Sequence, residues 1–207
     1  MLTGAGAAHA MATLMLISGS QSEQLSPGEA FSNPNFNGWD VVISFGTSSS
    51  PGLSPYGLDL ADVVETCWSG TGCATDPLEV YLSDTGFTQV ALGLGQTYST
   101  TGVGVTTQTA YADPSDTLFG TDTPTSEQIG TVTLTNSGAE SEPDNPAVSV
   151  GPGAYSLTLV DTYEADNGAG VFYSSDGDIH LPEPGSLVLF ASSLSVFGWV
   201  SRQRRLA

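Results

Sequence analysis

The sequence predicts an all-β fold, an antiparallel β-sandwich of the jelly-roll-like or immunoglobulin-like type, followed by a C-terminal transmembrane helix. Three observations lead to this expectation. Apolar and polar residues alternate in several short segments. Loops rich in Gly, Pro, Ser and Asp separate these segments. An uncharged stretch close to the C-terminus has the composition of a membrane-spanning helix.

The alternation is clearest at residues 39–45, where Trp39, Val41, Ile43 and Phe45 share one side of an extended chain. A half-buried antiparallel strand has this period of two and one apolar face. Loops are expected at residues 48–57, 113–125 and 138–146. Further strands are expected at residues 13–17, 78–83, 130–135, 155–163 and 171–173, with a pair of strands at 97–111 and a strand or one helical turn at 58–66.

The chain divides into three parts on composition. Residues 1–10 are interpreted as the remnant of a signal peptide, because Ala8-His9-Ala10 has the small-x-small form of a signal-peptidase site. The basic and long apolar regions of a complete signal are missing, so an ordinary N-terminus is the alternative. Residues 11–178 form the expected acidic sandwich domain, and residues 179–207 form a sorting signal.

The charge balance excludes several classes of function. There are 22 acidic residues and three basic ones, which gives a net charge of -19. Lysine is absent, and all three arginines lie at the C-terminus. Nucleic-acid binding is excluded because it depends on Lys and Arg neutralising phosphates. No cofactor is expected, since the body offers no cation to hold a phosphate group.

Calcium is the one ion that the acidic loops suggest. Asp161 and Asp166 lie in one polar cluster, and Asp176 and Asp178 in another. Clustered oxygen ligands suit Ca²⁺, but the spacing of an EF-hand is absent. Ordinary polar turns are therefore the alternative to metal ligands at these four positions.

The two cysteines predict a disulfide. Cys67 and Cys73 are separated by five residues that include two glycines, enough to close a small loop. In an exported protein such a pair is normally oxidised. A zinc site would need more ligands than two thiols and a distant histidine.

Elimination argues against an enzyme, and no catalytic residue is assigned. The histidines, His9 and His180, lie beside expected processing sites, so a Ser-His-Asp triad lacks a base. Asp84-Thr85-Gly86 spells the triplet of aspartic proteases, yet it occurs once and also fits a turn after a strand. A glycoside hydrolase using two carboxylates remains as an alternative, but the sequence selects no pair.

The C-terminal tail has three parts in order. Pro182, Glu183 and Pro184 interrupt regular structure. Residues 186–201 carry no charge over 16 residues, and as a helix they would reach about 24 Å, slightly short of a ~30 Å hydrocarbon core. Arg202, Arg204 and Arg205 then supply the positive charge that stops translocation and stays cytoplasmic. The acidic body is therefore expected to face outward.

This order of Pro-Glu-Pro, apolar helix and arginine cluster resembles the PEP-CTERM sorting signal of Gram-negative bacteria that produce exopolysaccharide. The resemblance covers about an eighth of the chain, with Leu181 in place of the usual valine before the motif. The phrases at 82–88 and 155–159 resemble uncharacterised β-rich members of that group. The resemblance implies an exosortase-type membrane protease as partner, anchoring in the inner membrane, and display at the cell surface or release after processing.

The expected function is that of an exported, non-catalytic protein of the cell surface or extracellular matrix, associated with exopolysaccharide. The first alternative is a carbohydrate-binding module. Trp39, Trp68 and Tyr56 are aromatic residues that could stack on sugars, although the alternating strand around Trp39 favours its burial. The second alternative is the carboxylate-based glycoside hydrolase.

Overall fold

The computed structural model describes residues 11–50, 57–67, 73–143, 148–165 and 170–180, and these residues form strands and connections without a helix. Within this part of the chain no helix is long and apolar enough to cross a membrane. The strands are β1 (Thr13–Ser18), β2 (Gln21–Gln24), β3 (Phe31–Phe36), β4 (Trp39–Ser48), β5 (Leu58–Thr66), β6 (Leu78–Phe87), β7 (Ala91–Asp113), β8 (Glu127–Pro143), β9 (Val148–Val150), β10 (Tyr155–Tyr163) and β11 (Val171–His180).

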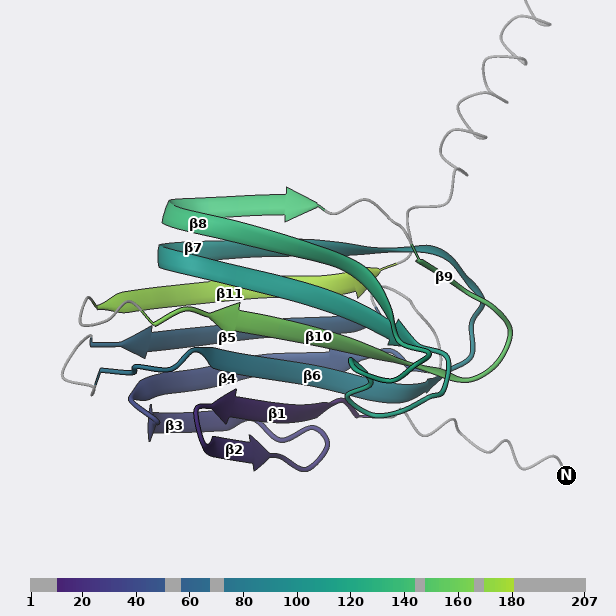
Figure 1. Cartoon of the computed structure of the whole chain (residues 1–207), viewed down its shortest axis with the longest axis horizontal. Helices are drawn as coiled ribbons and strands as arrows, with labels where there is room; N and C mark the ends of the chain where they lie inside the picture. Colours follow the sequence, from purple (N-terminus) through teal and green to yellow (C-terminus); the bar gives the residue numbers. More distant parts are fainter. Residues whose placement is uncertain (1–10, 51–56, 68–72, 144–147, 166–169, 181–207) are drawn as a thin grey trace, which may run out of the picture.

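All strands belong to one antiparallel sheet of eleven strands (Figure 1). Its main path runs β2-β1-β6-β10-β7-β11-β5-β4-β3, and β8 and β9 pair with β7 beside that path. β7 links the two layers of the molecule. Residues 95–103 of β7 pair with β11, whereas residues 106–113 pair with β10. β8 follows β7 around the same bend.

The bend in β7 requires glycine. Gly102 and Gly104 have φ angles of +147° and +132°, which residues with a side chain rarely adopt. Space is also lacking, because a Cβ atom at Gly102 would lie 1.9 Å from the carbonyl oxygen of Phe172. At Gly104 it would lie 1.9 Å from the hydroxyl of Tyr173. The two glycines let one strand change direction without losing its hydrogen bonds.

The apolar side of each strand lies between the two layers. β5 lies against β6 and β10, and β4 lies against β6. Trp39, the largest buried side chain, donates its indole N–H to the carbonyl of Asp76 at 3.0 Å. Its burial agrees with the alternation of β4. The predicted disulfide between Cys67 and Cys73 is confirmed and follows the end of β5.

The predicted sandwich of separate sheets is wrong. The sheet is continuous because β7 and β8 carry the backbone hydrogen bonds from one layer into the other. The expected strand pair at 97–111 is one strand, since Gly102 and Gly104 bend the chain instead of reversing it. The expected loop at 138–146 is also wrong in part, because β8 continues to Pro143. The predicted transmembrane helix at 186–201 lies outside the described residues.

Replacing Gly104 by Ala tests the bend. The added methyl group meets the Tyr173 hydroxyl and the residue must hold an unfavourable φ, so the free energy of unfolding should fall by roughly 1–3 kcal/mol. Denaturant unfolding measures this loss. Gly151→Ala is the matched control, because nothing lies within 4 Å of the added atom there. Equal stability of both variants would contradict the role assigned to the bend.

Candidate functional site

The candidate site lies on the outer surface of the layer formed by β1, β6, β10 and the second half of β7. Cross-strand pairing places Met15, Tyr81, Val160 and Thr109 next to one another across these four strands. Half-buried aromatic side chains lie on this surface. We call the group Tyr81, Tyr111 and Phe119, with the carboxylates Glu79 and Asp122, the outer aromatic face.

Tyr81 is the centre of the outer aromatic face. Its hydroxyl donates a hydrogen bond to Oε2 of Glu79 at 2.8 Å. Its ring meets that of Phe119 edge to face, with centroids 6.3 Å apart and planes at 88°. Burial, together with the hydrogen bond and charge of Glu79, raises the pKa of Tyr81 well above its ordinary value. The hydroxyl therefore remains protonated and stays a donor.

Tyr111 belongs to the same electrostatic environment. Burial raises the pKa of Tyr111, and the charges of Asp122 and Glu79 raise it further. Both carboxylates also raise the pKa of Tyr81, which places the four groups close enough to act on one another. The face thus combines tyrosine rings with negative charge.

Asp113 holds the loop that brings Phe119 over β6. Its carboxylate accepts hydrogen bonds from the backbone N–H of Ser115 at 2.9 Å, the hydroxyl of Ser115 at 2.6 Å and the hydroxyl of Thr125 at 2.6 Å. Burial by itself would raise the pKa of Asp113, but these bonds lower it to about 2. The backbone N–H of Phe119 then donates to Oγ of Ser83 at 2.9 Å.

Threonine hydroxyls extend the face toward β8. Thr107 and Thr133 are hydrogen-bonded at 3.0 Å, and Thr109 and Thr131 at 3.2 Å. Nε2 of Gln128 also donates to the hydroxyl of Thr131 at 2.7 Å. These hydroxyl and amide groups add neutral polar contacts beside the tyrosines.

A hollow of about 220 Å³ adjoins the other side of the face. It is lined by Ile17, Gly19, Asp76, Pro77 and Glu79. Glu79 therefore belongs both to this hollow and to the hydrogen bond of Tyr81. A second hollow of about 210 Å³ lies near the connection between β2 and β3, against β4. None of the lining residues that the structure describes is aromatic.

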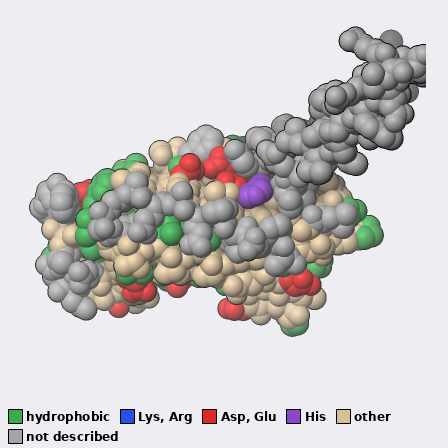
Figure 2. Space-filling view, turned by 90° about the horizontal axis from the view of Figure 1, so that it is seen from above, with side chains coloured by type: hydrophobic (Ala, Val, Ile, Leu, Met, Phe, Trp, Pro, Cys, Tyr) green, Lys and Arg blue, Asp and Glu red, His purple; other side chains and the backbone are tan. Residues whose placement is uncertain are grey.

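The face offers many acceptors and no cationic donor. All three arginines of the chain lie beyond residue 200, so the described residues include neither Lys nor Arg. Glu79 and Asp122 consequently have no basic side chain to pair with in this part of the chain. Figure 2 shows another side of the molecule, where acidic side chains gather near a histidine and no Lys or Arg is visible on the described surface. Ligands that donate hydrogen bonds fit such a surface best.

The three predicted calcium ligands that the structure describes lie on different sides of the sheet. Asp161 lies in the core on β10, whereas Asp176 and Asp178 lie on the outer side of β11. Asp166 lies outside the described residues. Across the described ranges no three His, Cys, Asp or Glu residues form a group that could hold a metal ion.

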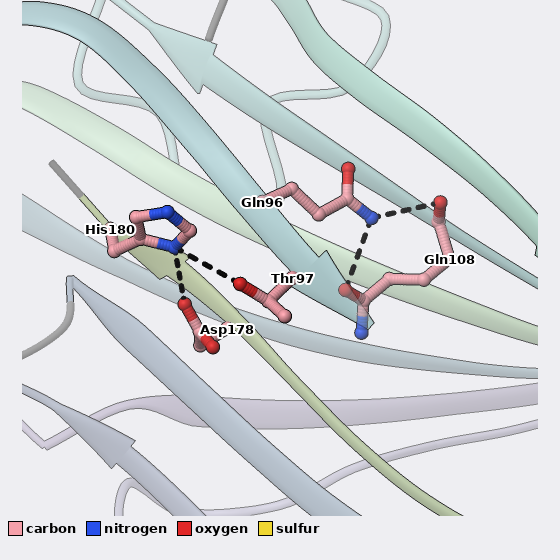
Figure 3. A network of polar contacts seen from close by, with 5 residues as sticks. All are labelled: Gln96, Thr97, Gln108, Asp178 and His180. Carbon is pink, nitrogen blue, oxygen red and sulfur yellow. Dashed lines mark hydrogen bonds and ion pairs between the residues drawn. The ribbon is translucent and has the colours of Figure 1, made fainter. Parts of the chain in front are cut away.

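Asp178 is paired with the histidine next to the tail. Its Oδ1 lies 2.6 Å from Nδ1 of His180, and the hydroxyl of Thr97 lies 3.5 Å from the same nitrogen (Figure 3). Both partners contact one ring nitrogen, so this arrangement is not the relay of a catalytic triad. Burial, followed by the charges of Asp176 and Asp178, raises the pKa of the neighbouring Asp59 to about 6.

Asp84-Thr85-Gly86 is not the turn after a strand that its sequence suggests. The triplet lies inside β6, where pairing with β10 is irregular. Asp84 is buried, and the N–H of Gly86 donates to Oδ1 of Asp116 at 2.7 Å. The triplet therefore helps to attach the loop that follows β7.

Other predicted functional positions fall outside the described residues. These are residues 1–10, Tyr56, Trp68, and the tail with the motif Pro182, Glu183 and Pro184 and with Arg202, Arg204 and Arg205. The sequence did not single out Tyr81, Tyr111 or Phe119. A signal for Tyr81 was present, because it alternates with Leu78, Val80 and Leu82 on the polar side of its strand.

No known protein family and no curated protein matches the chain. Solved structures that match the chain include two with low similarity. TmCBM61 in complex with β-1,4-galactotriose has 13% identity over 72% of this chain and 92% of that chain, with a TM-score of 0.38. The enzymatically active domain of tailspike protein 4 from bacteriophage CBA120 has 14% identity over 72% of this chain and 20% of that chain, with a TM-score of 0.27. Likeness at this level assigns no function.

Replacing Asp113 by Ala tests how the loop is held. Because the pKa of Asp113 lies below the ordinary 3.8, its carboxylate stabilises the fold above about pH 4, and this contribution is lost as the pH falls toward 2. Asp113→Ala should speed amide hydrogen exchange in residues 114–126 at pH 7. It should also reduce the dependence of the free energy of unfolding on pH between pH 4 and pH 2. Glu127→Ala, at the exposed end of the loop, should change neither. Unchanged exchange in Asp113→Ala would disprove the anchoring role.

Proposed function

We propose that the domain is a carbohydrate-binding module that binds polysaccharide on the outer aromatic face. The observation that carries the proposal is the group of half-buried rings, Tyr81, Tyr111 and Phe119, beside carboxylates without basic partners. Ring faces can cover the apolar C–H surface of a sugar. Carboxylates accept strong hydrogen bonds from its hydroxyl groups. The threonines of β7 and β8 extend the polar contact along a chain of sugars.

The charge of the protein favours a neutral polysaccharide. With a net charge of -19 and no Lys or Arg before residue 202, the domain repels anionic sugars such as uronic acids. A hydroxyl-rich neutral chain instead supplies hydrogen-bond donors that Glu79 and Asp122 can accept. The hollow next to Glu79 offers room for one branch or one end of that chain.

The domain is proposed to bind without hydrolysis. Two carboxylates line the hollow among the described residues, Glu79 and Asp76, and each already accepts a hydrogen bond. Glu79 accepts from the hydroxyl of Tyr81, and Oδ2 of Asp76 accepts from Nδ2 of Asn37 at 3.3 Å. In this proposal the resemblance of the tail to a PEP-CTERM signal supplies the route to the cell surface, where exopolysaccharide is found.

Binding is tested with the full chain against neutral polysaccharides and one polyuronate, by affinity electrophoresis and calorimetry. The neutral set includes β-1,4-galactan, of which the β-1,4-galactotriose in the TmCBM61 structure is a three-sugar fragment. Tyr81→Ala and Phe119→Ala should each weaken binding about tenfold or more, the effect of removing a central aromatic contact worth above ~1 kcal/mol.

Phe172→Ala is the matched control, because this half-buried aromatic lies on β11 in the other layer. It should bind as the wild type does. Binding that is unaffected by Tyr81→Ala and Phe119→Ala would place the site elsewhere, and no binding to any polysaccharide would reject the proposal.

Delivery is tested separately by cell fractionation and intact-mass analysis. The wild type should reach the surface or medium without its tail. Pro184→Thr changes the Pro-Glu-Pro motif, and a deletion from Leu181 onward removes the motif together with the positive charge behind it, so both variants should alter processing. Retention of the unprocessed wild-type chain in the cytoplasm would reject the sorting proposal and leave the binding proposal intact.

A further inference from the structure

Two aspartates lie in the middle of the domain, one from each layer. Asp62 of β5 is 2% exposed and Asp161 of β10 is fully buried. The hydroxyl of Tyr163 reaches both carboxyl groups, at 2.6 Å from Oδ1 of Asp62 and 3.3 Å from Oδ2 of Asp161. The two carboxyl groups therefore share one hydroxyl across the interface between the layers.

The remaining partners of the pair are neutral. The hydroxyl of Ser175 donates to Oδ1 of Asp62 at 2.6 Å, and Nε2 of Gln108 donates to Oδ1 of Asp161 at 2.7 Å. Nε2 of Gln96 donates in turn to both the backbone and the side-chain oxygen of Gln108 at 3.0 Å (Figure 3). Oδ2 of Asp62 has no hydrogen-bond partner among the described residues.

Among the residues that the structure describes, no titratable group near the pair can balance two negative charges. The titratable neighbours of the pair are Tyr98 of β7 and two residues of β11, the buried Tyr173 and the exposed Asp176. The residues paired with Asp62, Asp161 and Gln108 on the neighbouring strands do not titrate, since they are Ile43 of β4, Val80 of β6 and Val132 of β8. Two unpaired buried carboxylates would be costly, so the fold requires a compensating positive charge.

A proton is the compensating charge that fits the geometry. The hydrogen bonds are short, and the described pockets of the molecule lie elsewhere, against β1, β4 and β6. Burial raises the pKa of Asp62 to about 6, against the opposing effect of its hydrogen bonds from Ser175 and Tyr163. Burial, and then the charge of Asp62, raises the pKa of Asp161 well above its usual range.

We infer that the Asp62–Tyr163–Asp161 cluster is a proton-binding site that joins the two layers. The domain is therefore most stable in acid and loses stability as the pH rises above neutral. The unfolded chain releases these protons near pH 4, whereas the folded chain holds them to higher pH. The stabilisation is therefore complete below about pH 4 and is lost as the pH rises through 6 and beyond.

The cluster lies directly beneath the proposed binding face. Val160 and Thr162, which flank Asp161 on β10, point to the outer side, where Val160 pairs with Tyr81. Loosening of the layers at high pH would therefore disturb the platform that carries the aromatic rings. The inference itself rests on the interior contacts and does not depend on what the face binds.

The test is denaturant unfolding of the full chain between pH 5 and pH 9. Asp161→Asn keeps an acceptor oxygen for Gln108 but carries no charge at any pH. The wild-type midpoint should fall as the pH rises. In Asp161→Asn this fall should be at most half as large, and the variant should be more stable than the wild type at pH 8. Glu127→Gln, an exposed control, should keep the wild-type slope. Parallel slopes for the wild type and Asp161→Asn would overturn the inference.

Two further measurements keep the test decisive. An infrared carbonyl band of a protonated carboxylic acid should be present in the wild type at pH 7, whether or not the variants fold, and its absence would overturn the inference. Calcium should not change the wild-type midpoint at pH 8. A calcium-dependent rise that disappears in Asp161→Asn would identify a cation site instead of a proton site.

Discussion

The unbroken hydrogen bonding of β7 around its bend determines the arrangement of the whole molecule. Gly102 and Gly104 allow the strand to leave one layer and enter the other while it remains paired with β8. β11 and β10 are thereby placed on successive halves of one strand, facing each other across the core. The inner surface of this arrangement holds the buried aspartates, and the outer surface carries Tyr81 and Tyr111.

A single compositional feature acts in two ways in this fold. The body contains no lysine or arginine, so among the described residues the carboxyl groups find no ion-pair partner apart from the contact of Asp178 with His180. On the outer aromatic face, water covers the carboxylates and leaves them available as acceptors. Inside, water is excluded, and a charge without a partner raises the free energy of the folded state. In the proposals made above, the same kind of side chain thus provides binding groups outside and a proton site inside.

Some of these features were accessible from the pattern of the residues and others were not. The alternation around Trp39 correctly predicted its burial, and the spacing of Cys67 and Cys73 correctly predicted the disulfide. Asp161 was interpreted through its acidic neighbours as a surface ligand, although it continues the inward alternation of Leu157 and Leu159. Local polarity outweighed periodicity in that interpretation, whereas Asp161 is buried together with the leucines that share its side of the strand.

The sequence by itself determined the β-structure, the acidity and the pairing of the cysteines, because these depend on composition and on residues close together in the chain. Only the tertiary structure decided that one sheet forms instead of two, that Phe119 covers Tyr81, and that Asp62 meets Asp161 across 99 positions of sequence. Such contacts depend on strand order and register. These are set by which surfaces bury together over the whole chain, and no local pattern encodes them.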